Sequence, residues 1–224
     1  MNSTEYLYFR QFTYDLLRRL FMTEPTPQLL QLLQQQSLSE LFCNESLPQA
    51  LTDAAMAMDD ALSDNAFIQG SAAFENLHWD FTRLFIGPEK PPAPPWESSY
   101  VSRDKLLFQR CTNEVKQCYA DAGFELKGPY LEAADHIGYE LDFLWRLTTR
   151  LVNALEQFNV AEIQQQLQEQ QQFLQAHLLR FAQAFSDLVQ THAQTSFYQA
   201  AGSLLGQFLQ LEQHRLPQVI EDLK

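Results

Sequence analysis

The sequence predicts an all-α protein, a bundle of roughly eight to ten helices without strands. Apolar residues recur at three- and four-residue spacing along most of the chain, which is the period of an amphipathic helix. The chain contains only seven glycines, too few for the turn-rich sandwiches and barrels of all-β proteins. Its 224 residues, of which 46% are hydrophobic, suffice to bury a core as one large helical domain or two small ones.

The first half of the chain predicts four helices whose ends are marked by prolines and capping residues. Each begins at a serine, threonine or acidic residue and carries its leucines, phenylalanines and alanines on one face. We expect these helices over residues 5–22, from Thr26-Pro27 onward, from Ser46-Leu47-Pro48 onward and over residues 71–85, where Gly87-Pro88 ends the last of them.

The second half predicts longer helices. Helical spacing resumes at Leu106 and Leu107 and ends near Gly123, and Asp135 is expected to cap a long helix that reaches Leu155. The glutamine-rich run over residues 164–175 keeps apolar residues at helical spacing, so we interpret it as a solvated helix face. A last helix follows a cap at Ser196, and its Gly202-xxx-Gly206 pattern predicts a close contact between helices.

Two stretches interrupt this helical regularity. The segment from Gly87 to Tyr100 has five prolines in its first nine residues, which forces an extended loop. The segment from Phe124 to His136 contains Gly128-Pro129 and is also irregular. Functional residues tend to collect in loops that a rigid scaffold holds, so these two stretches are where we expect the functional site.

The net charge of −13 restricts the possible partners. A negative field repels nucleic-acid phosphates and anionic lipid headgroups, so we expect neither nucleic acid nor a membrane surface as a partner. The same field would attract a basic peptide, although an acidic surplus also serves solubility alone.

The cysteines and the N-terminus predict a cytoplasmic protein. The three cysteines form no CxxC pair and leave an odd count, which argues against a disulfide framework and favours a reducing compartment. No apolar run is long enough to cross a bilayer, and residues 1–5 have no basic start followed by an apolar stretch. We therefore expect neither export nor membrane insertion.

Motifs for catalysis and cofactor binding are missing from the sequence. The chain has no GxxxxGK pattern for phosphate, no nucleophile elbow, and a single ExxH motif at Glu75–His78 where a di-iron bundle needs two. We expect no metal, no cofactor and no enzymatic activity. A rival hypothesis is a small hydrolase that uses Asp135 and His136 with a nucleophile that a linear sequence does not reveal.

Three segments in the middle of the chain resemble a known family. They are Phe81-Thr-Arg-Leu84-Phe85-Ile-Gly87-Pro88, then Pro94-Pro95-Trp96-Glu97-Ser98-Ser-Tyr100, then Asp135-His136-Ile137-Gly138-Tyr-Glu140-Leu141-Asp-Phe143-Leu144. In order and spacing they are similar to the TorD/DmsD family of redox enzyme maturation chaperones, and the resemblance spans about residues 6–211.

This resemblance implies an all-α fold of two parts. Residues 1–130, with a proline-rich loop at 87–97, would form an N-terminal bundle, and residues 131–224 a smaller C-terminal helical part, with a hinge near 124–136. One compact domain is the alternative. Monomers and domain-swapped homodimers both occur among such proteins.

The implied function is a cytoplasmic chaperone that binds the twin-arginine signal peptide of a molybdopterin-dependent oxidoreductase, including contact with its mature part, and delays export until the cofactor is inserted. The peptide's apolar core would lie in a hydrophobic groove and its arginines would meet carboxylates at the rim. The expected peptide-binding residues are Phe81, Leu84, Phe85, Pro95, Trp96, Glu97, Tyr100, Asp135 and His136.

Alternative interpretations remain open for these residues. Five of the expected groove residues fit an ordinary core equally well, namely Phe81, Leu84, Phe85, Trp96 and Tyr100. His136 could satisfy the hydrogen-bonding groups at the end of its own helix. Besides the hydrolase, a purely structural helical subunit that assembles with a partner enzyme is a further hypothesis.

Overall fold

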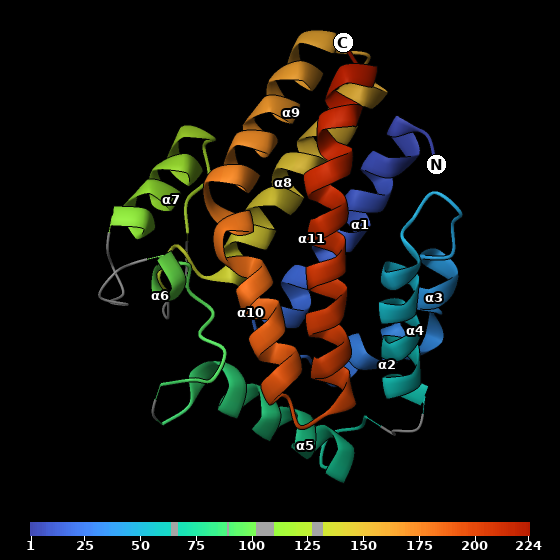
Figure 1. Ribbon diagram of the computed structural model, residues 1–224, viewed down its shortest axis with the longest axis vertical. Coiled ribbons are helices and arrows are strands. Elements are labelled where there is room, and N and C mark those ends of the chain that lie inside the picture. The colour runs from blue at the N-terminus through green and yellow to red at the C-terminus, as the bar shows by residue number, and fades with distance from the viewer. Residues whose placement is uncertain (64–66, 89, 102–109, 127–131) are drawn as a thin grey trace. The chain divides into compact units, whose positions relative to one another are not determined.

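The computed structural model describes residues 1–63, 67–88, 90–101, 110–126 and 132–224 (Figure 1). In these ranges the chain is helical, and its only bridge of β type is an isolated one between Trp96 and His136. The predicted all-α class is confirmed. The elements are α1 (Ser3–Phe21), α2 (Pro27–Gln35), α3 (Leu38–Leu41), α4 (Gln49–Ser63), α5 (Ala72–Phe81), the π-helical turn η1 (Thr82–Ile86), α6 (Ser98–Val101), α7 (Arg110–Asp121), α8 (Ile137–Glu156), α9 (Val160–Phe173), a second π-helical turn η2 (Leu174–Leu178), α10 (Leu179–His192) and α11 (Ser196–Asp222).

The helix starts follow the local capping rules. Asn2 and Glu5 form a capping box at the start of α1, and the Thr26 hydroxyl accepts from the Leu29 amide at the start of α2. The short α3 was not expected from the sequence. Its first turn is held from outside, because the Asp59 carboxylate on α4 accepts from the Leu38 amide at 2.9 Å.

The helix expected over residues 71–85 changes its winding before its end. It begins at the predicted Ser71 cap, but α5 stops at Phe81 and the chain continues as the π-helical turn η1. The Gly87 amide closes this turn by donating to the Thr82 carbonyl at 2.7 Å. Gly87 has a φ of 54°, a left-handed conformation that glycine adopts without strain, so the helix ends here.

By internal contacts the described chain divides into two compact units. Unit 1 comprises Met1, Thr23–Pro94 and Gln183–Leu211, and unit 2 comprises Asn2–Met22, Pro95–Ala182 and Glu212–Lys224. These boundaries differ from the expected division after residue 130, which remains a prediction. Of the expected hinge at 124–136, residues 127–131 lie outside the described residues, as do Leu106 and Leu107.

Unit 1 holds an aromatic interior that the ends of its helices surround. Phe81 and Phe85 contact each other and both contact Tyr198 on α11, with ring centroids 5.1 to 6.1 Å apart. The buried Asp80 carboxylate accepts from the Thr195 amide at 2.8 Å, just before α11 begins. Thr195, rather than the predicted Ser196, caps that helix, since its hydroxyl accepts from the Tyr198 amide.

The predicted close contact at Gly202 and Gly206 is confirmed inside unit 1. A Cβ built on Gly206 would lie 2.5 Å from the Ser186 hydroxyl oxygen on α10, and one on Gly202 would lie 3.0 Å from a Val189 methyl. The Ser186 hydroxyl also donates to the Gly202 carbonyl at 2.7 Å. Side chains larger than hydrogen would separate the two helices here.

Unit 2 is built on α8, which lies between α1 and α9 (Figure 1). A fully buried ion pair joins Arg10 on α1 to Glu212, with Nε 2.7 and 2.8 Å from the two carboxylate oxygens. Tyr6 and Tyr14 donate to the same carboxylate, and Arg10 also donates to Gln170 on α9. No described helix combines the length and apolarity needed to cross a bilayer.

Candidate functional site

The two irregular segments singled out by the sequence meet in unit 2. The Pro95 carbonyl accepts from the Ile137 amide at 2.7 Å, and the Glu97 amide donates to the Asp135 carbonyl at 2.9 Å. The isolated bridge between Trp96 and His136 lies between these two bonds. We call this arrangement of residues 95–98 and 134–137 the junction.

The Asp135 side chain accepts a hydrogen bond inside the junction and does not cap the helix that follows it, α8. Its Oδ2 accepts from the Ser98 amide at 2.8 Å, at the start of α6. Asp135 is fully buried, and among the described residues no donor lies within hydrogen-bond distance of its Oδ1. The sequence predicted Asp135 as the cap of α8, and this prediction was wrong because the carboxylate is held by Ser98.

His136 is the residue that caps α8. Its Nδ1 accepts from the Gly138 amide at 3.0 Å, so the ring proton resides on Nε2. Burial lowers the pKa of His136 to about 4, although the charge of Asp135 opposes this shift. The imidazole is therefore neutral at neutral pH, and the Trp96 ring meets it edge-on at 6.2 Å.

Glu97 connects the junction to the helices that follow it in the chain. Its buried carboxylate accepts from His177 Nδ1 on η2 and from Arg180 Nη1 on α10, each at 3.0 Å. Burial lowers the pKa of His177, but its hydrogen bonds to Cys118 and Glu97 and their negative charges outweigh burial and raise this pKa to about 9. His177 is thus a cation at neutral pH, paired with the Glu97 anion.

His177 and Arg180 were missed by the sequence analysis. They lie 80 and 83 residues after Glu97, beyond the glutamine-rich run, and no linear motif joins them to it. A partial signal existed, since His177 falls on the apolar stripe of Leu174, Leu178 and Phe181. A buried histidine on such a stripe requires a polar partner, but its identity comes only from the fold.

A third carboxyl group lies inside the same region. Glu140, in the first turn of α8, is fully buried, and no described residue donates a hydrogen bond to either of its oxygens. Burial, followed by the negative charges of Glu97 and Asp135, raises the pKa of Glu140 well above its usual value. The surroundings of Glu140 therefore favour its protonated, uncharged form.

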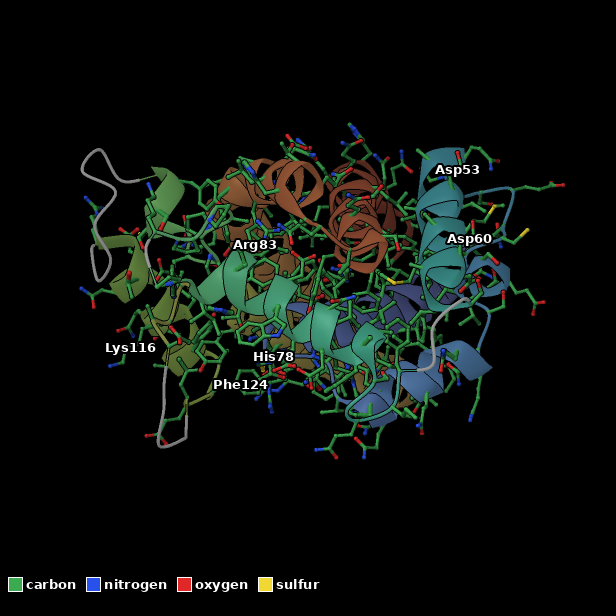
Figure 2. All side chains as sticks on the ribbon, turned by 90° about the horizontal axis from the view of Figure 1, so that it is seen from below. Asp53, Asp60, His78, Arg83, Lys116 and Phe124 are labelled. Carbon is green, nitrogen blue, oxygen red and sulfur yellow. The ribbon has the colours of Figure 1, made fainter. Side chains whose placement is uncertain are left out.

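Two clefts open on unit 2 near the junction. The larger has a volume of about 740 Å³ and includes Ala133 and Ala134, which directly precede Asp135. Tyr119 helps to hold this wall, because its hydroxyl donates to the Ala134 carbonyl at 3.0 Å. The cleft is lined by Thr112, Asn113, Lys116, Tyr119, Ala120, Gly123, Phe124, Glu125, Leu126, Glu132, Ala133 and Ala134, of which Figure 2 labels Lys116 and Phe124.

The smaller cleft has a volume of about 350 Å³ and adjoins His177. Aromatic side chains from α8 and α9 contribute Phe143 and Phe173 to its lining. Two carboxylates, Asp121 and Glu169, also line it. The remaining lining residues are Cys118, Ala122, Leu147, Gln172 and Ala176.

The nine predicted binding residues occupy three kinds of position. Pro95, Glu97, Asp135 and His136 are buried at the junction, where Trp96 is partly exposed. Tyr100 is also partly exposed and packs on Phe181 with ring centroids 5.5 Å apart. None of the nine lines either of the two described clefts. The remaining three of the nine are buried in unit 1, namely Phe81, Leu84 and Phe85.

Comparison with known proteins identifies the family of this chain. A family model described as "Nitrate reductase delta subunit" matches residues 44–187. This range includes the three segments of the sequence that carry the family resemblance. "Chaperone protein TorD" of Vibrio vulnificus is 30% identical over 196 residues, which is 88% of this chain and 89% of that protein. The chain belongs to the TorD/DmsD family of chaperones.

Other family members align over shorter stretches. TorD of Aliivibrio salmonicida is 32% identical over 136 residues, and "Tat proofreading chaperone DmsD" of Salmonella typhimurium is 32% identical over 145 residues. These alignments cover 61% and 65% of this chain, but only 62% and 64% of the two relatives, less than two thirds of their length.

Membership of this family decides between the classes of function considered above. The protein is a chaperone of the redox enzyme maturation class and not an enzyme. The hydrolase hypothesis is therefore set aside. Within the described residues, no three His, Cys, Asp or Glu side chains form a group that could hold a metal ion.

Proposed function

We propose that this chaperone acts in the cytoplasm, binds the twin-arginine signal peptide of a molybdopterin-dependent oxidoreductase, and delays export until the cofactor is inserted. The observation that supports this proposal best is the larger cleft of unit 2, which combines apolar side chains with two carboxylates beside the junction. The chain's net charge of −13 would speed the approach of a basic peptide to this cleft.

The cleft suits the two chemical features of such a peptide. Tyr119, Phe124 and Leu126 offer apolar surface for the hydrophobic core of the signal peptide. Glu125 and Glu132 offer carboxylates that a guanidinium group can contact with two parallel hydrogen bonds. Burial of the apolar core would supply most of the affinity, and the charged contacts would fix the register of the peptide.

The junction residues have a supporting role in this proposal. Asp135 and His136 fix the entry to α8 and hence the wall formed by Ala133 and Ala134. Trp96 and Tyr100 are the two predicted residues that are partly exposed, so we propose that they contact the peptide directly. For Phe81, Leu84 and Phe85, their burial in unit 1 favours the alternative interpretation as core residues.

Calorimetric titration of the full chain with synthetic signal peptides tests the proposal. A peptide with the arginine pair should bind, and its lysine-pair counterpart should bind at least about tenfold more weakly, because lysine cannot form the bidentate contact. Equal affinity for both peptides, or no binding of either, would contradict the proposed recognition.

The cleft itself is tested by comparing two double variants that each remove two negative charges. We expect Glu125→Gln/Glu132→Gln to weaken binding of the arginine peptide about tenfold or more, since hydrogen bonds to charged groups contribute about 1.5–3 kcal/mol each. The matched control is Asp53→Asn/Asp60→Asn, which removes two charges from exposed positions on α4 in unit 1 (Figure 2). An equal loss in both double variants would show a general field effect and exclude this cleft as the site.

A second candidate function is an assembly subunit that binds the mature oxidoreductase and never contacts its signal peptide. The description of the matching family model, "Nitrate reductase delta subunit", favours it. Binding to a client enzyme that lacks its signal peptide, together with no binding of the isolated peptide, would support this candidate. Sedimentation of the free chain would show whether it is a monomer or a homodimer, because the family resemblance leaves both a monomer and a domain-swapped homodimer open.

A further inference from the structure

A cysteine, a histidine and a glutamate lie in line beside the smaller cleft of unit 2. The Cys118 sulfur on α7 lies 3.8 Å from His177 Nε2, and the other ring nitrogen, Nδ1, lies 3.0 Å from Glu97 Oε2. The carboxylate thus orients the imidazole, and the imidazole faces the sulfur. This is the order of groups by which proteins activate a nucleophilic thiol.

The charges along this line favour the reactive form of the sulfur. The pKa of His177 is raised to about 9, so its Nε2 carries a proton at neutral pH and donates toward Cys118. A cation at this distance stabilises a thiolate, which is the nucleophilic form of cysteine. The anion of this row, the Glu97 carboxylate, is already paired with His177.

Cys118 lies at a cleft that opens to the outside of the protein. Cys118 is partly exposed, and both it and His177 line the cleft of about 350 Å³. The other two cysteines offer a useful contrast. Cys43 is exposed but has no such partner among the described residues, whereas Cys111 is buried and burial raises its pKa. Only Cys118 combines access with a facing imidazolium in the described chain.

We propose that Cys118 is a modification site, a nucleophilic thiol that forms a mixed disulfide with small neutral or cationic disulfides bound in this cleft. The sulfur attacks one sulfur of the disulfide, a new S–S bond forms, and the original S–S bond breaks. The departing thiolate takes the proton from His177 and leaves as a free thiol. An excess of any small thiol reverses the reaction.

The lining of the cleft determines which disulfides are accepted. Phe143 and Phe173 provide apolar contacts, while Asp121 and Glu169 place negative charge around a cleft of a chain that is already strongly acidic. An anionic disulfide is repelled by these carboxylates and a cationic one is attracted. The inference goes beyond the chaperone function and does not depend on signal-peptide binding.

The experiment compares the three cysteines of the full chain by peptide mass spectrometry after short exposure to a disulfide at neutral pH. The probes are cystamine, which is cationic, and dithiodipropionate, which is anionic and of similar size. We expect Cys118 to react with cystamine at least about tenfold faster than the exposed Cys43, and faster with cystamine than with dithiodipropionate. If Cys118 reacts no faster than Cys43, the proposal is overturned.

A substitution separates activation from mere exposure. His177→Gln should slow the reaction of Cys118 about tenfold or more and leave Cys43 unchanged, whereas the control His192→Gln, at an exposed histidine, should change neither. Because His177 is buried, circular dichroism must show that its variant is folded, and the comparison of Cys118 with Cys43 in the natural chain tests the proposal without any substitution. An unchanged rate at Cys118 in a folded His177→Gln variant also overturns the proposal.

Discussion

The buried ion pair between Arg10 and Glu212 gives a stability prediction that the geometry sets closely. Both side chains are fully buried, and the Glu212 carboxylate accepts from Arg10, Tyr6 and Tyr14 at 2.5 to 2.8 Å. Burial raises the pKa of each tyrosine, as does the charge of Glu212, so both hydroxyls keep their protons and remain donors. One anion therefore organises three donors from α1.

Replacing Glu212 by leucine leaves the Arg10 guanidinium buried without a counterion. A buried charge that loses its partner costs about 3–5 kcal/mol, and we expect about 4 kcal/mol for Glu212→Leu. Arg10→Met should cost less, about 3 kcal/mol, because the remaining carboxylate keeps two tyrosine donors. The double variant should cost about 4 kcal/mol, no more than the worse single one, since it leaves no unpaired charge.

Urea unfolding followed by circular dichroism measures these differences. The double-variant cycle should give a coupling energy of about 3 kcal/mol, at the upper end for residues in contact. The control is Arg19→Met, which breaks the more exposed pair with Asp15 and should change stability by less than about 1 kcal/mol. If the double variant costs the sum of the two single ones, about 7 kcal/mol, the pair does not act as a unit and the reasoning is refuted.

Three further predictions concern the first turn of α8. His136 has a pKa lowered from 6.5 to about 4, so stability present above pH 6.5 should fall by about 3 kcal/mol on acidification to pH 4. The variant His136→Asn, which keeps a cap, should lack this loss. Parallel acid profiles of the two proteins would contradict the prediction. Glu140 has a raised pKa, so the folded state holds a proton that the unfolded state releases above pH 4.5. The natural chain should therefore lose stability relative to Glu140→Gln as the pH rises above 4.5, and a constant difference from pH 5 to pH 8 would speak against this. Gly138→Ala should lower stability by about 1–3 kcal/mol, because the new Cβ would lie 2.5 Å from the Met22 Cα, and an unchanged melting temperature would show that α1 and α8 can separate freely.

Sequence reasoning succeeded where local rules decide the structure. The Thr26-Pro27 start of α2, the extent of α1 and the contact of Gly202 and Gly206 with α10 all follow from residues close together in the chain or on one helix face. Capping, helical period and glycine spacing act over a few residues, so no knowledge of the tertiary fold is needed to apply them.

It failed where a distant partner competes for the same group. Asp135 is a better cap than histidine by propensity, but the Ser98 amide takes its carboxylate and His136 caps α8 instead. The π-helical turns at Thr82–Ile86 and Leu174–Leu178 were also missed, because one extra residue per turn barely alters an apolar pattern. His177, which pairs with Glu97, lies in the second of these turns, so the pairing could not be foreseen from the apolar pattern.

Unit 2 contains two buried clusters of ionisable side chains, and they differ in how completely their carboxyl groups are hydrogen-bonded. Around Glu212 one anion meets one cation and two tyrosine donors, so the charges are paired. We explain this cluster by its contribution to stability alone. At the junction, one oxygen of Asp135 lacks any described donor, and both oxygens of Glu140, in the first turn of α8, lack one too. Burying carboxyl groups without partners costs free energy that an ordinary core avoids. A binding or reactive site is one reason for a fold to retain such a cost, and both proposals are therefore placed near these two carboxyl groups.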